Sequence, residues 1–163
     1  MIKLIAAVGK NKELGKRGKL IWKLKGDMAF FKTQTIGHTV VMGANTFRSL
    51  PKKLANRTHY VLTTGSIKES DDESVRVFSD FVKLLEEVKQ LSKKQDVFIV
   101  GGANIYNLFM NFADEILLTE IDAKEAFADV FFPCFDKSKY TRCVLASNEE
   151  NGIKYSHVRY VKV

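Results

Sequence analysis

Residues 96–110 read DVFIVGGANIYNLFM, and consecutive parts of this stretch predict three different structures. Asp96–Val100 is a nearly continuous apolar run, as is typical of a strand that a sheet buries on both faces. Gly101-Gly102 ends the strand, and Ala103–Met110 then follows helical spacing. A strand, a glycine turn and a helix in succession form the unit of a parallel α/β sheet.

The same alternation of strands and helices extends outward over most of the chain. Strands are predicted, in chain order, at Ile2–Val8, Thr39–Met42, Thr58–Thr63, Val75–Phe78, Asp96–Val100 and Glu115–Ile121. Helices are predicted at residues 26–35, Asn45–Leu50, residues 81–91 and Ala103–Met110. The apolar stripe of residues 81–91 has the clearest helical period, with Ser79 as its expected N-cap. Residues 9–23 predict a long polar loop, and such loops are often functional.

The last part of the chain predicts a β-hairpin. Two strand patterns, Tyr140–Ala146 and Ile153–Val161, flank a turn at Glu150-Asn151-Gly152. Asn-Gly between strand patterns is the strongest short-range hairpin signal. The predicted fold is therefore α/β: one domain over residues 1–163, with a mainly parallel central sheet flanked by helices and a C-terminal antiparallel hairpin.

Composition excludes several classes of protein. With 45% hydrophobic and 28% charged residues, the chain is expected to be globular rather than disordered. The apolar stretches are too short for a membrane helix or a signal-peptide core. Cys134 and Cys143 predict reduced cytosolic thiols rather than a disulfide framework. The three histidines are far apart in the sequence, which argues against a zinc site.

The net charge of +7 favours a polyanionic partner. A nucleic-acid-binding protein would show a stripe of lysine and arginine with exposed aromatic residues. Here the cations are scattered, and aromatic residues such as Phe98 and Phe131 lie in core-like runs. A small polyanionic ligand therefore fits the charge better than nucleic acid does.

Three strand ends predict a site for such a ligand. Gly101-Gly102 and Gly43 follow two apolar strands, and Thr63-Thr64 follows a third. Ligands of open α/β sheets gather at the carboxyl ends of strands, where glycines let a phosphate approach backbone amides. The spacing is not that of the dinucleotide-binding fingerprint, and two glycines also occur where a chain merely turns a corner.

Two charged residues are candidates for chemistry. Asp27 follows Trp22 and lies one turn before Phe30 and Phe31, so burial there would raise its pKa and suit it to proton donation. The alternative is that Asp27 simply begins a helix. Arg57, in a loop beside apolar residues, has the geometry to bind a carboxylate, although most loop arginines are solvated.

Taken together, eight segments in one order resemble the dihydrofolate reductase family over nearly the whole chain. They are Met1–Ala7, Leu14-Gly15 with Leu20–Leu24, Asp27–Lys32, Val41–Phe47, Leu54 with Arg57, Val100–Tyr106, Thr119–Asp122 and Asp129–Pro133. The resemblance implies NADPH-dependent reduction of 7,8-dihydrofolate to 5,6,7,8-tetrahydrofolate by a cytoplasmic monomer that also binds antifolates. It implies no metal, nucleic acid or membrane.

The resemblance also implies the site residues. The catalytic group is Asp27, Leu20, Trp22 and Thr119. The substrate-binding group is Ile5, Ala7, Asp27, Met28, Phe31, Leu50, Leu54, Arg57, Val100, Tyr106 and Thr119. The cofactor-binding group is Ala7, Leu14, Gly15, Gly43, Ala44, Asn45, Thr46, Leu62, Thr63, Thr64, Val100, Gly101, Gly102, Ala103, Asn104, Ile105 and Tyr106.

Some positions depart from the family pattern. Ile21 and Lys25 stand where proline is common. Ala44 stands where many members have an arginine that binds the 2′-phosphate of the cofactor. Asn104 stands where some members place another arginine. We expect Thr63, Thr64 and Arg76 to compensate for these missing arginines in binding the phosphate. The alternative enzyme is a pyrimidine reductase of riboflavin synthesis, which shares the fold but needs neither Asp27 after Trp22 nor Arg57 for a glutamate tail.

Overall fold

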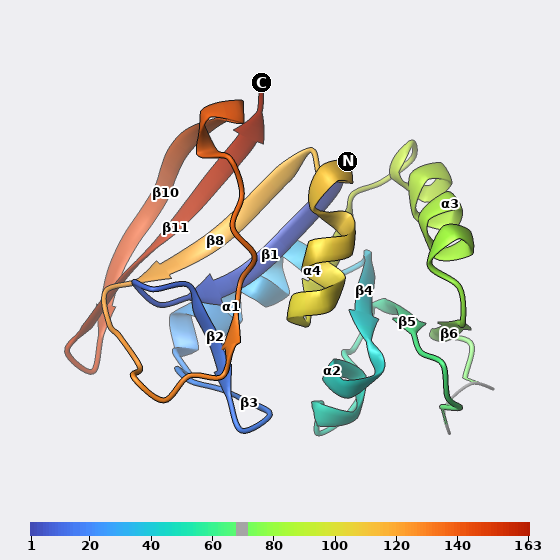
Figure 1. Ribbon diagram of the computed structural model, residues 1–163, viewed down its shortest axis with the longest axis horizontal. Helices are drawn as coiled ribbons and strands as arrows, with labels where there is room; N and C mark the ends of the chain where they lie inside the picture. The colour runs from blue at the N-terminus through green and yellow to red at the C-terminus, as the bar shows by residue number, and fades with distance from the viewer. Residues whose placement is uncertain (68–71) are drawn as a thin grey trace.

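A computed structural model describes residues 1–67 and 72–163, and an eight-stranded sheet runs through its centre (Figure 1). The strands lie in the order β10 (Tyr140–Glu150), β11 (Ile153–Lys162), β8 (Glu115–Ile121), β1 (Ile2–Val8), β7 (Val97–Gly101), β4 (Thr39–Gly43), β5 (Thr58–Leu62) and β6 (Val75–Phe78). The six strands from β8 to β6 are parallel, whereas β11 runs antiparallel to both β8 and β10. The predicted α/β fold with a C-terminal hairpin is confirmed.

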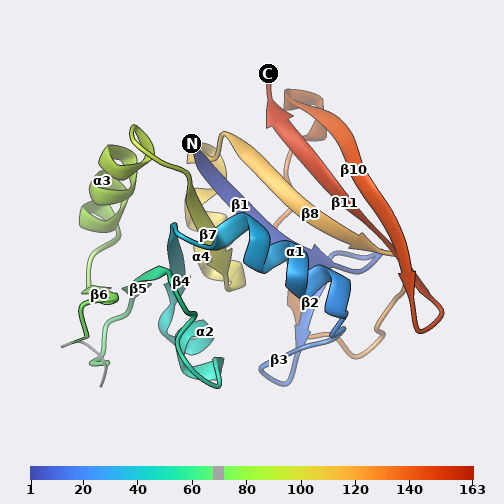
Figure 2. The ribbon, with the colours of Figure 1, turned by 180° about the vertical axis from the view of Figure 1, so that it is seen from behind.

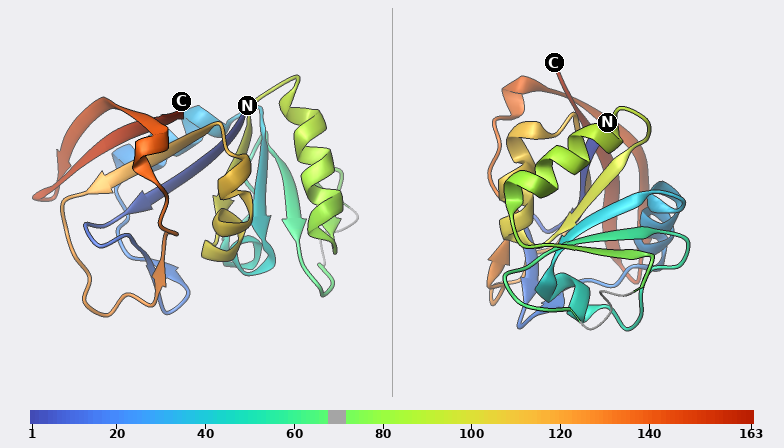
Figure 3. Two further views of the ribbon diagram at one scale, coloured as in Figure 1. Left: turned by 45° about the horizontal axis from the view of Figure 1, so that its top comes forward. Right: turned by 90° about the vertical axis from the view of Figure 1, so that its right-hand side faces the viewer.

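Each face of the sheet carries helices that bury a separate apolar core. Leu84 of α3 (Phe81–Ser92) and Phe109 of α4 (Ala103–Phe109) pack with Ile99 on one face. On the opposite face, Phe30 of α1 (Lys25–Thr35) and Phe47 of α2 (Ala44–Ser49) pack on the other side of the strands. Figure 2 shows α1 lying across its face, and the right-hand view of Figure 3 shows α3 and α4 on the side away from α1. Because β7 is buried on both faces, its sequence is almost continuously apolar.

Two sequence-based expectations about local structure are wrong. Residues 9–23 are not simply a loop, because β2 (Glu13–Lys16) and β3 (Lys19–Leu20) form a small sheet with β9 (Val130–Phe131). Such short strands depend on a partner more than a hundred residues away and leave no periodic signal. The N-cap of α3 is Asp80 rather than Ser79, since the Asp80 carboxylate accepts a hydrogen bond from the Val82 amide at 2.9 Å.

Other elements differ from the expectation only in their extent. Three-residue 3₁₀ turns occur at Met110–Phe112 and Lys137–Lys139. The β10 strand continues to Glu150, four residues past the expected end, because its polar outer residues lie on an exposed edge where no apolar alternation is needed. The hairpin turn is therefore Asn151-Gly152 alone, with φ values of 53° and 78°. Positive φ at both central positions is the reason that Asn-Gly suits this turn.

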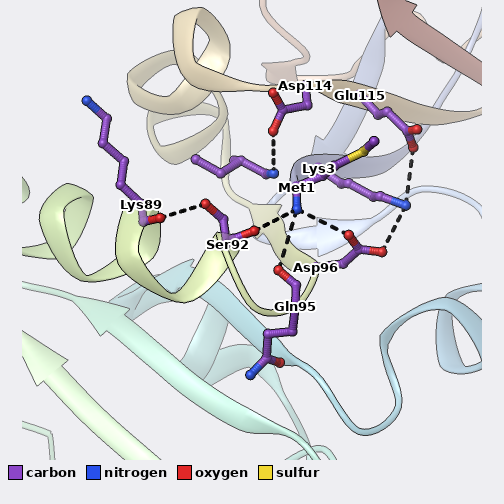
Figure 4. A network of polar contacts seen from close by, with 9 residues as sticks. Met1, Lys3, Lys89, Ser92, Gln95, Asp96, Asp114 and Glu115 are labelled. Atoms are coloured by element: carbon purple, nitrogen blue, oxygen red, sulfur yellow. Dashed lines mark hydrogen bonds and ion pairs between the residues drawn. The ribbon is translucent and has the colours of Figure 1, made fainter.

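Ion pairs and hydrogen bonds anchor the start of β1 between its neighbours (Figure 4). The Lys3 ammonium lies 3.1 Å from the Asp96 carboxylate and 3.3 Å from that of Glu115. The Ile2 amide donates to the Asp114 carboxylate at 2.8 Å. These contacts connect β1 to the chain just before β7 and at the start of β8, so the three strands run in register to their carboxyl ends. In the part of the chain that the structure describes, no helix has the length and apolar character needed to cross a membrane.

Candidate active site

The centre of the site is a hydrogen bond between α1 and β8. The sheet pairs Thr119 of β8 with Ala7 of β1, next to the carboxyl end of both strands. Helix α1 crosses this end of the sheet and brings Asp27 to the same place. The Thr119 hydroxyl donates to Oδ1 of Asp27 at 2.5 Å. Two residues that are 92 positions apart in the sequence thus form one polar unit.

The environment of Asp27 raises its pKa above that of an exposed aspartate. Its side chain is 21% exposed, and burial raises the pKa of Asp27, although the hydrogen bond from Thr119 and the nearby His157 act in the opposite direction. The expected direction of this shift is confirmed. A carboxyl group with a raised pKa at the rim of an apolar wall is suited to hold a proton or to bind a protonated heterocycle.

His157 belongs to the same cluster, and sequence reasoning missed it. Its Nδ1 lies 3.0 Å from the Thr119 hydroxyl and 3.8 Å from Oδ1 of Asp27. The imidazole is 4% exposed and stacks on Phe30, with ring centroids 3.9 Å apart and an interplanar angle of 12°. The feature that brings His157 to the site is the pairing of β11 with β8, which puts His157 opposite Thr119. The Asn-Gly turn predicts a hairpin but does not specify that register.

An apolar wall extends from Asp27 along the α1 and α2 side of the sheet. Among the predicted substrate-binding residues, it gathers Ile5, Phe31, Leu50, Leu54 and Val100. These side chains would provide a flat apolar ligand with a surface on which to pack. The predicted site residue Met28 is not part of this wall, because it is 62% exposed on α1.

Arg57 lies at the far end of this wall and is held by two contacts. Its Nε donates to the Ala55 carbonyl at 3.0 Å, and its Nη1 donates to the Thr35 hydroxyl at 3.1 Å. The Thr35 hydroxyl in turn donates to the Phe31 carbonyl at 2.8 Å. A guanidinium has five N–H bonds, so one on Nη1 and both on Nη2 remain for other partners. Two of these three, one on Nη1 and one on Nη2, can bind a carboxylate through both of its oxygens.

The segment over residues 9–23 connects the site to a loop far along the chain. Glu13 is buried, and its carboxylate accepts hydrogen bonds from the Asn11 amide at 2.6 Å and the Glu125 amide at 2.7 Å. Although burial alone would raise the pKa of Glu13, these amides hold it below its usual value. The predicted cofactor residue Gly15 accepts a hydrogen bond from the Asp129 amide at 3.1 Å.

The two predicted catalytic residues of this segment differ in their surroundings. The Trp22 indole packs so closely on Gly9 that a Cβ there would lie 2.5 Å from the ring, which excludes any larger residue. Leu20, in contrast, is 67% exposed on β3. The structure therefore brings Trp22 into the packed part of the site and presents Leu20 to solvent.

Most of the predicted cofactor residues gather at the carboxyl ends of three adjacent strands, β7, β4 and β5. Gly101 has a φ of 126°, which strains any residue other than glycine. A Cβ on Gly43 would lie 3.2 Å from Ile105, and one on Gly102 would lie 3.6 Å from the Thr46 hydroxyl. Gly43 thus lets α4 approach the end of β4 closely, whereas a Cβ on Gly102 would make only an ordinary van der Waals contact with Thr46 of α2. The predicted residue Tyr106 is buried behind them and donates to the Ile5 carbonyl at 2.7 Å.

The polar groups around these strand ends fit a nucleotide. Thr63 follows β5, and its hydroxyl accepts a hydrogen bond from the Gly65 amide at 3.0 Å. Arg76, expected to compensate for the alanine at position 44, is instead held by Glu87 of α3 at 3.1 Å. The remaining predicted cofactor residues of the central sheet and its helices stand at or near the same edge: Ala7, Ala44, Asn45, Leu62, Thr64, Val100, Ala103 and Asn104. The predicted residue Leu14 lies instead on β2 of the small sheet. Within residues 1–67 and 72–163, no three metal-ligating side chains gather into a metal site.

Comparisons with known proteins point to one family. The family model described as dihydrofolate reductase matches residues 1–162. A dihydrofolate reductase of Bacillus subtilis is 33% identical over 165 residues, covering 99% of this chain and 95% of the relative. One from Buchnera aphidicola of Acyrthosiphon pisum is 31% identical, with 95% of each chain covered. Dihydrofolate reductase HdrB of Haloferax volcanii is 34% identical, covering 84% of this chain and 73% of the relative.

Proposed function

The chain belongs to the dihydrofolate reductase family, and we propose that NADPH is the nicotinamide cofactor with which it reduces dihydrofolate. When bound, NADPH supplies the hydride that C6 of the pterin receives, and a proton is added at N5 to give tetrahydrofolate. The close strand ends with Gly43, Gly101 and Gly102 support a bound dinucleotide there. The hydroxyls of Thr63 and Thr64 support recognition of its 2′-phosphate.

Asp27 anchors and polarises the pterin in this proposal. Its carboxylate binds the amino group and N3 of the ring, and Thr119 fixes the orientation of that carboxylate. The observation that carries the proposal is the short hydrogen bond from Thr119 to a half-buried Asp27 beside an apolar wall. A negative charge in these surroundings favours a protonated ring, which is what addition of hydride at C6 requires.

The other predicted residues position the substrate and exclude water. Phe31, Leu50 and Ile5 pack against the pterin and benzoyl rings. Two N–H bonds of Arg57, one on each Nη, bind the α-carboxylate of the glutamate tail. The segment that contains Trp22 and Leu20 closes over the nicotinamide, which keeps bulk water from the reacting atoms.

The experiment that tests the proposal measures NADPH consumption in the presence of dihydrofolate. We expect the wild-type protein to be active and Asp27→Asn to bind NADPH and fold as the wild type does. Its rate of hydride transfer at neutral pH should fall about 100-fold or more, because it lacks the group that favours protonation. Near-full activity of Asp27→Asn would remove Asp27 from the mechanism.

The alternative functions have less support. A pyrimidine reductase would have no use for the Arg57 arrangement, and the family match is to dihydrofolate reductase.

We also propose that the protein is a cytoplasmic monomer. The free, exposed thiols of Cys134 and Cys143 support a reducing compartment. Thermal protection by NADPH or methotrexate, compared with salt-sensitive retention on DNA, distinguishes the reductase from a nucleic-acid-binding protein.

A further inference from the structure

His157 is a buried, titratable side chain in contact with the proposed catalytic pair, yet no step of the mechanism above uses it. Its imidazole faces Asp27 of α1 and Thr119 of β8. Among the described residues, Tyr155 of the same strand also faces it, with ring centroids 5.6 Å apart, and the charge of Glu150 at the end of β10 raises the pKa of Asp27 itself. From the edge strand, the residue opposite His157 is the uncharged Ala146. The surroundings of His157 are therefore simple enough to assign its hydrogen bonds.

The direction of each hydrogen bond follows from the charge on Asp27. An ionised carboxylate only accepts, so the Thr119 hydroxyl must donate its single proton to Asp27. The contact between Thr119 and His157 is then satisfied only if Nδ1 of His157 carries a proton and donates to the Thr119 oxygen. This chain of hydrogen bonds runs from His157 through Thr119 to Asp27, and each donor polarises the next.

The same three groups also accommodate a protonated Asp27. Its O–H then donates to the Thr119 oxygen, and the Thr119 hydroxyl turns to donate to an unprotonated Nδ1 of His157. A neutral imidazole exists in two tautomers, one for each direction of the chain. A phenyl ring would fill the same space on Phe30 but would neither donate nor accept.

We infer that His157 is a positioning residue that keeps its Nδ1 protonated, donates to the Thr119 oxygen and so holds the Thr119 hydroxyl toward an ionised Asp27. This inference rests on the proposed role of Asp27. Burial of the imidazole lowers the pKa of His157, whereas the charge of Asp27 raises it. The neutral ring therefore acts as an oriented dipole above neutral pH. Removing the imidazole should reduce the stabilisation of the ionised Asp27 carboxylate and so raise the pKa of Asp27.

The pH profile of kcat/KM for dihydrofolate tests the inference. Activity should fall as pH rises through the apparent pKa of Asp27 and its bound substrate, because the proton for N5 is then lost. In His157→Phe, we expect the midpoint to move upward by about half a unit to one unit, the value of one hydrogen bond in the chain. At pH values above both midpoints this variant would be about three- to tenfold faster than the wild type, relative to its own maximum.

His157→Asn is the matched control, because its short amide can donate or accept near the position of Nδ1. We expect its midpoint to stay within about a quarter of a unit of the wild-type value. A purely structural role would lower the rate at every pH and leave the midpoint of both variants unchanged. That result, or equal shifts in the Phe and Asn variants, would overturn the inference.

A measurement on the wild-type protein keeps the inference testable should His157→Phe not fold. Nitrogen-15 NMR at pH 8 should show His157 in the Nδ1–H tautomer, with its resonances assigned by their loss in His157→Asn. An Nε2–H tautomer at that pH contradicts the chain. Asp27→Asn separates the two ideas: if it is fully active, the role of Asp27 and this inference both fail, and if it is inactive while His157→Phe leaves the midpoint unchanged, only this inference fails.

Discussion

Arg57→Lys tests how the protein recognises the glutamate tail of its substrate. Two of the five guanidinium N–H bonds are already used by Ala55 and Thr35, and two of the other three, one on each Nη, are predicted to bind the tail carboxylate. A lysine keeps the charge but lacks the rigid fork, so it loses at least one of the two charge-assisted hydrogen bonds. Each such bond contributes about 1.5–3 kcal/mol.

That loss predicts how the steady-state constants change. A factor of ten corresponds to about 1.36 kcal/mol, so KM for dihydrofolate should rise about 10- to 150-fold. The tail lies away from the reacting atoms, so kcat should change little. The assay is NADPH consumption at varied dihydrofolate, repeated with a dihydropterin that lacks the glutamate tail. Wild-type and Arg57→Lys proteins should handle the tail-less substrate equally well.

Two results would refute this reasoning. If Arg57→Lys is impaired equally toward the tail-less substrate, then Arg57 supports the loop through its contacts with Thr35 and Ala55 rather than binding the tail. If kcat falls while KM stays constant, the carboxylate of the tail does not reach the fork. A thermal unfolding curve of each protein shows whether the exchange of Arg57 has disturbed the fold itself.

Two further predictions concern the cofactor and the loop. Ala44→Arg should improve the preference for NADPH over NADH about tenfold or more, measured as the ratio of kcat/KM, since it adds a cation at the start of α2; an unchanged ratio means that the missing arginine does not set cofactor choice. Glu13→Gln should lower the free energy of unfolding in urea at pH 7 by about 1.5–3 kcal/mol, because it weakens the bonds from the Asn11 and Glu125 amides. The pKa of Glu13 is lowered in the folded protein, so the unfolded state binds more protons. The difference in unfolding free energy between wild type and variant should therefore be full above the ordinary pKa near 4.5. It should vanish as the pH falls through the pKa of the folded state. A difference that persists at low pH contradicts a charge-based role.

Local sequence signals were sufficient for most of the sheet. The bounds of β1, β6 and β8 agree with the sequence-based prediction residue for residue. Apolar runs end at turn residues in each case, so the information lies within the element itself. The small sheet of β2, β3 and β9 could not be predicted in this way. Its pairing of Glu13 with Phe131 is a tertiary contact, and four- and two-residue strands are too short to show a period.

In the candidate site, too, local sequence indicated some features and only the tertiary structure showed the others. Asp27 and Arg57 were found because each lies in a recognisable segment, beside Phe30 and Phe31 in one case and after Leu54 in the other. The hydrogen bonds that prepare these side chains were not predictable. Thr35 precedes Arg57 by 22 residues, and nothing local to either position indicates that the one accepts a hydrogen bond from the other.

The amino-acid sequence alone determines the α/β alternation, the C-terminal hairpin and the family, because those depend on patterns within short segments. The tertiary structure alone decides what surrounds Asp27. Asp27, Thr119 and His157 come from a helix, a parallel strand and an antiparallel strand, and they meet because β11 pairs with β8 in one register. A shift of one residue in that pairing would turn His157 to the other face of the sheet. The proton chemistry that we propose for this cluster therefore depends on strand register, which the packing of both faces of the sheet enforces.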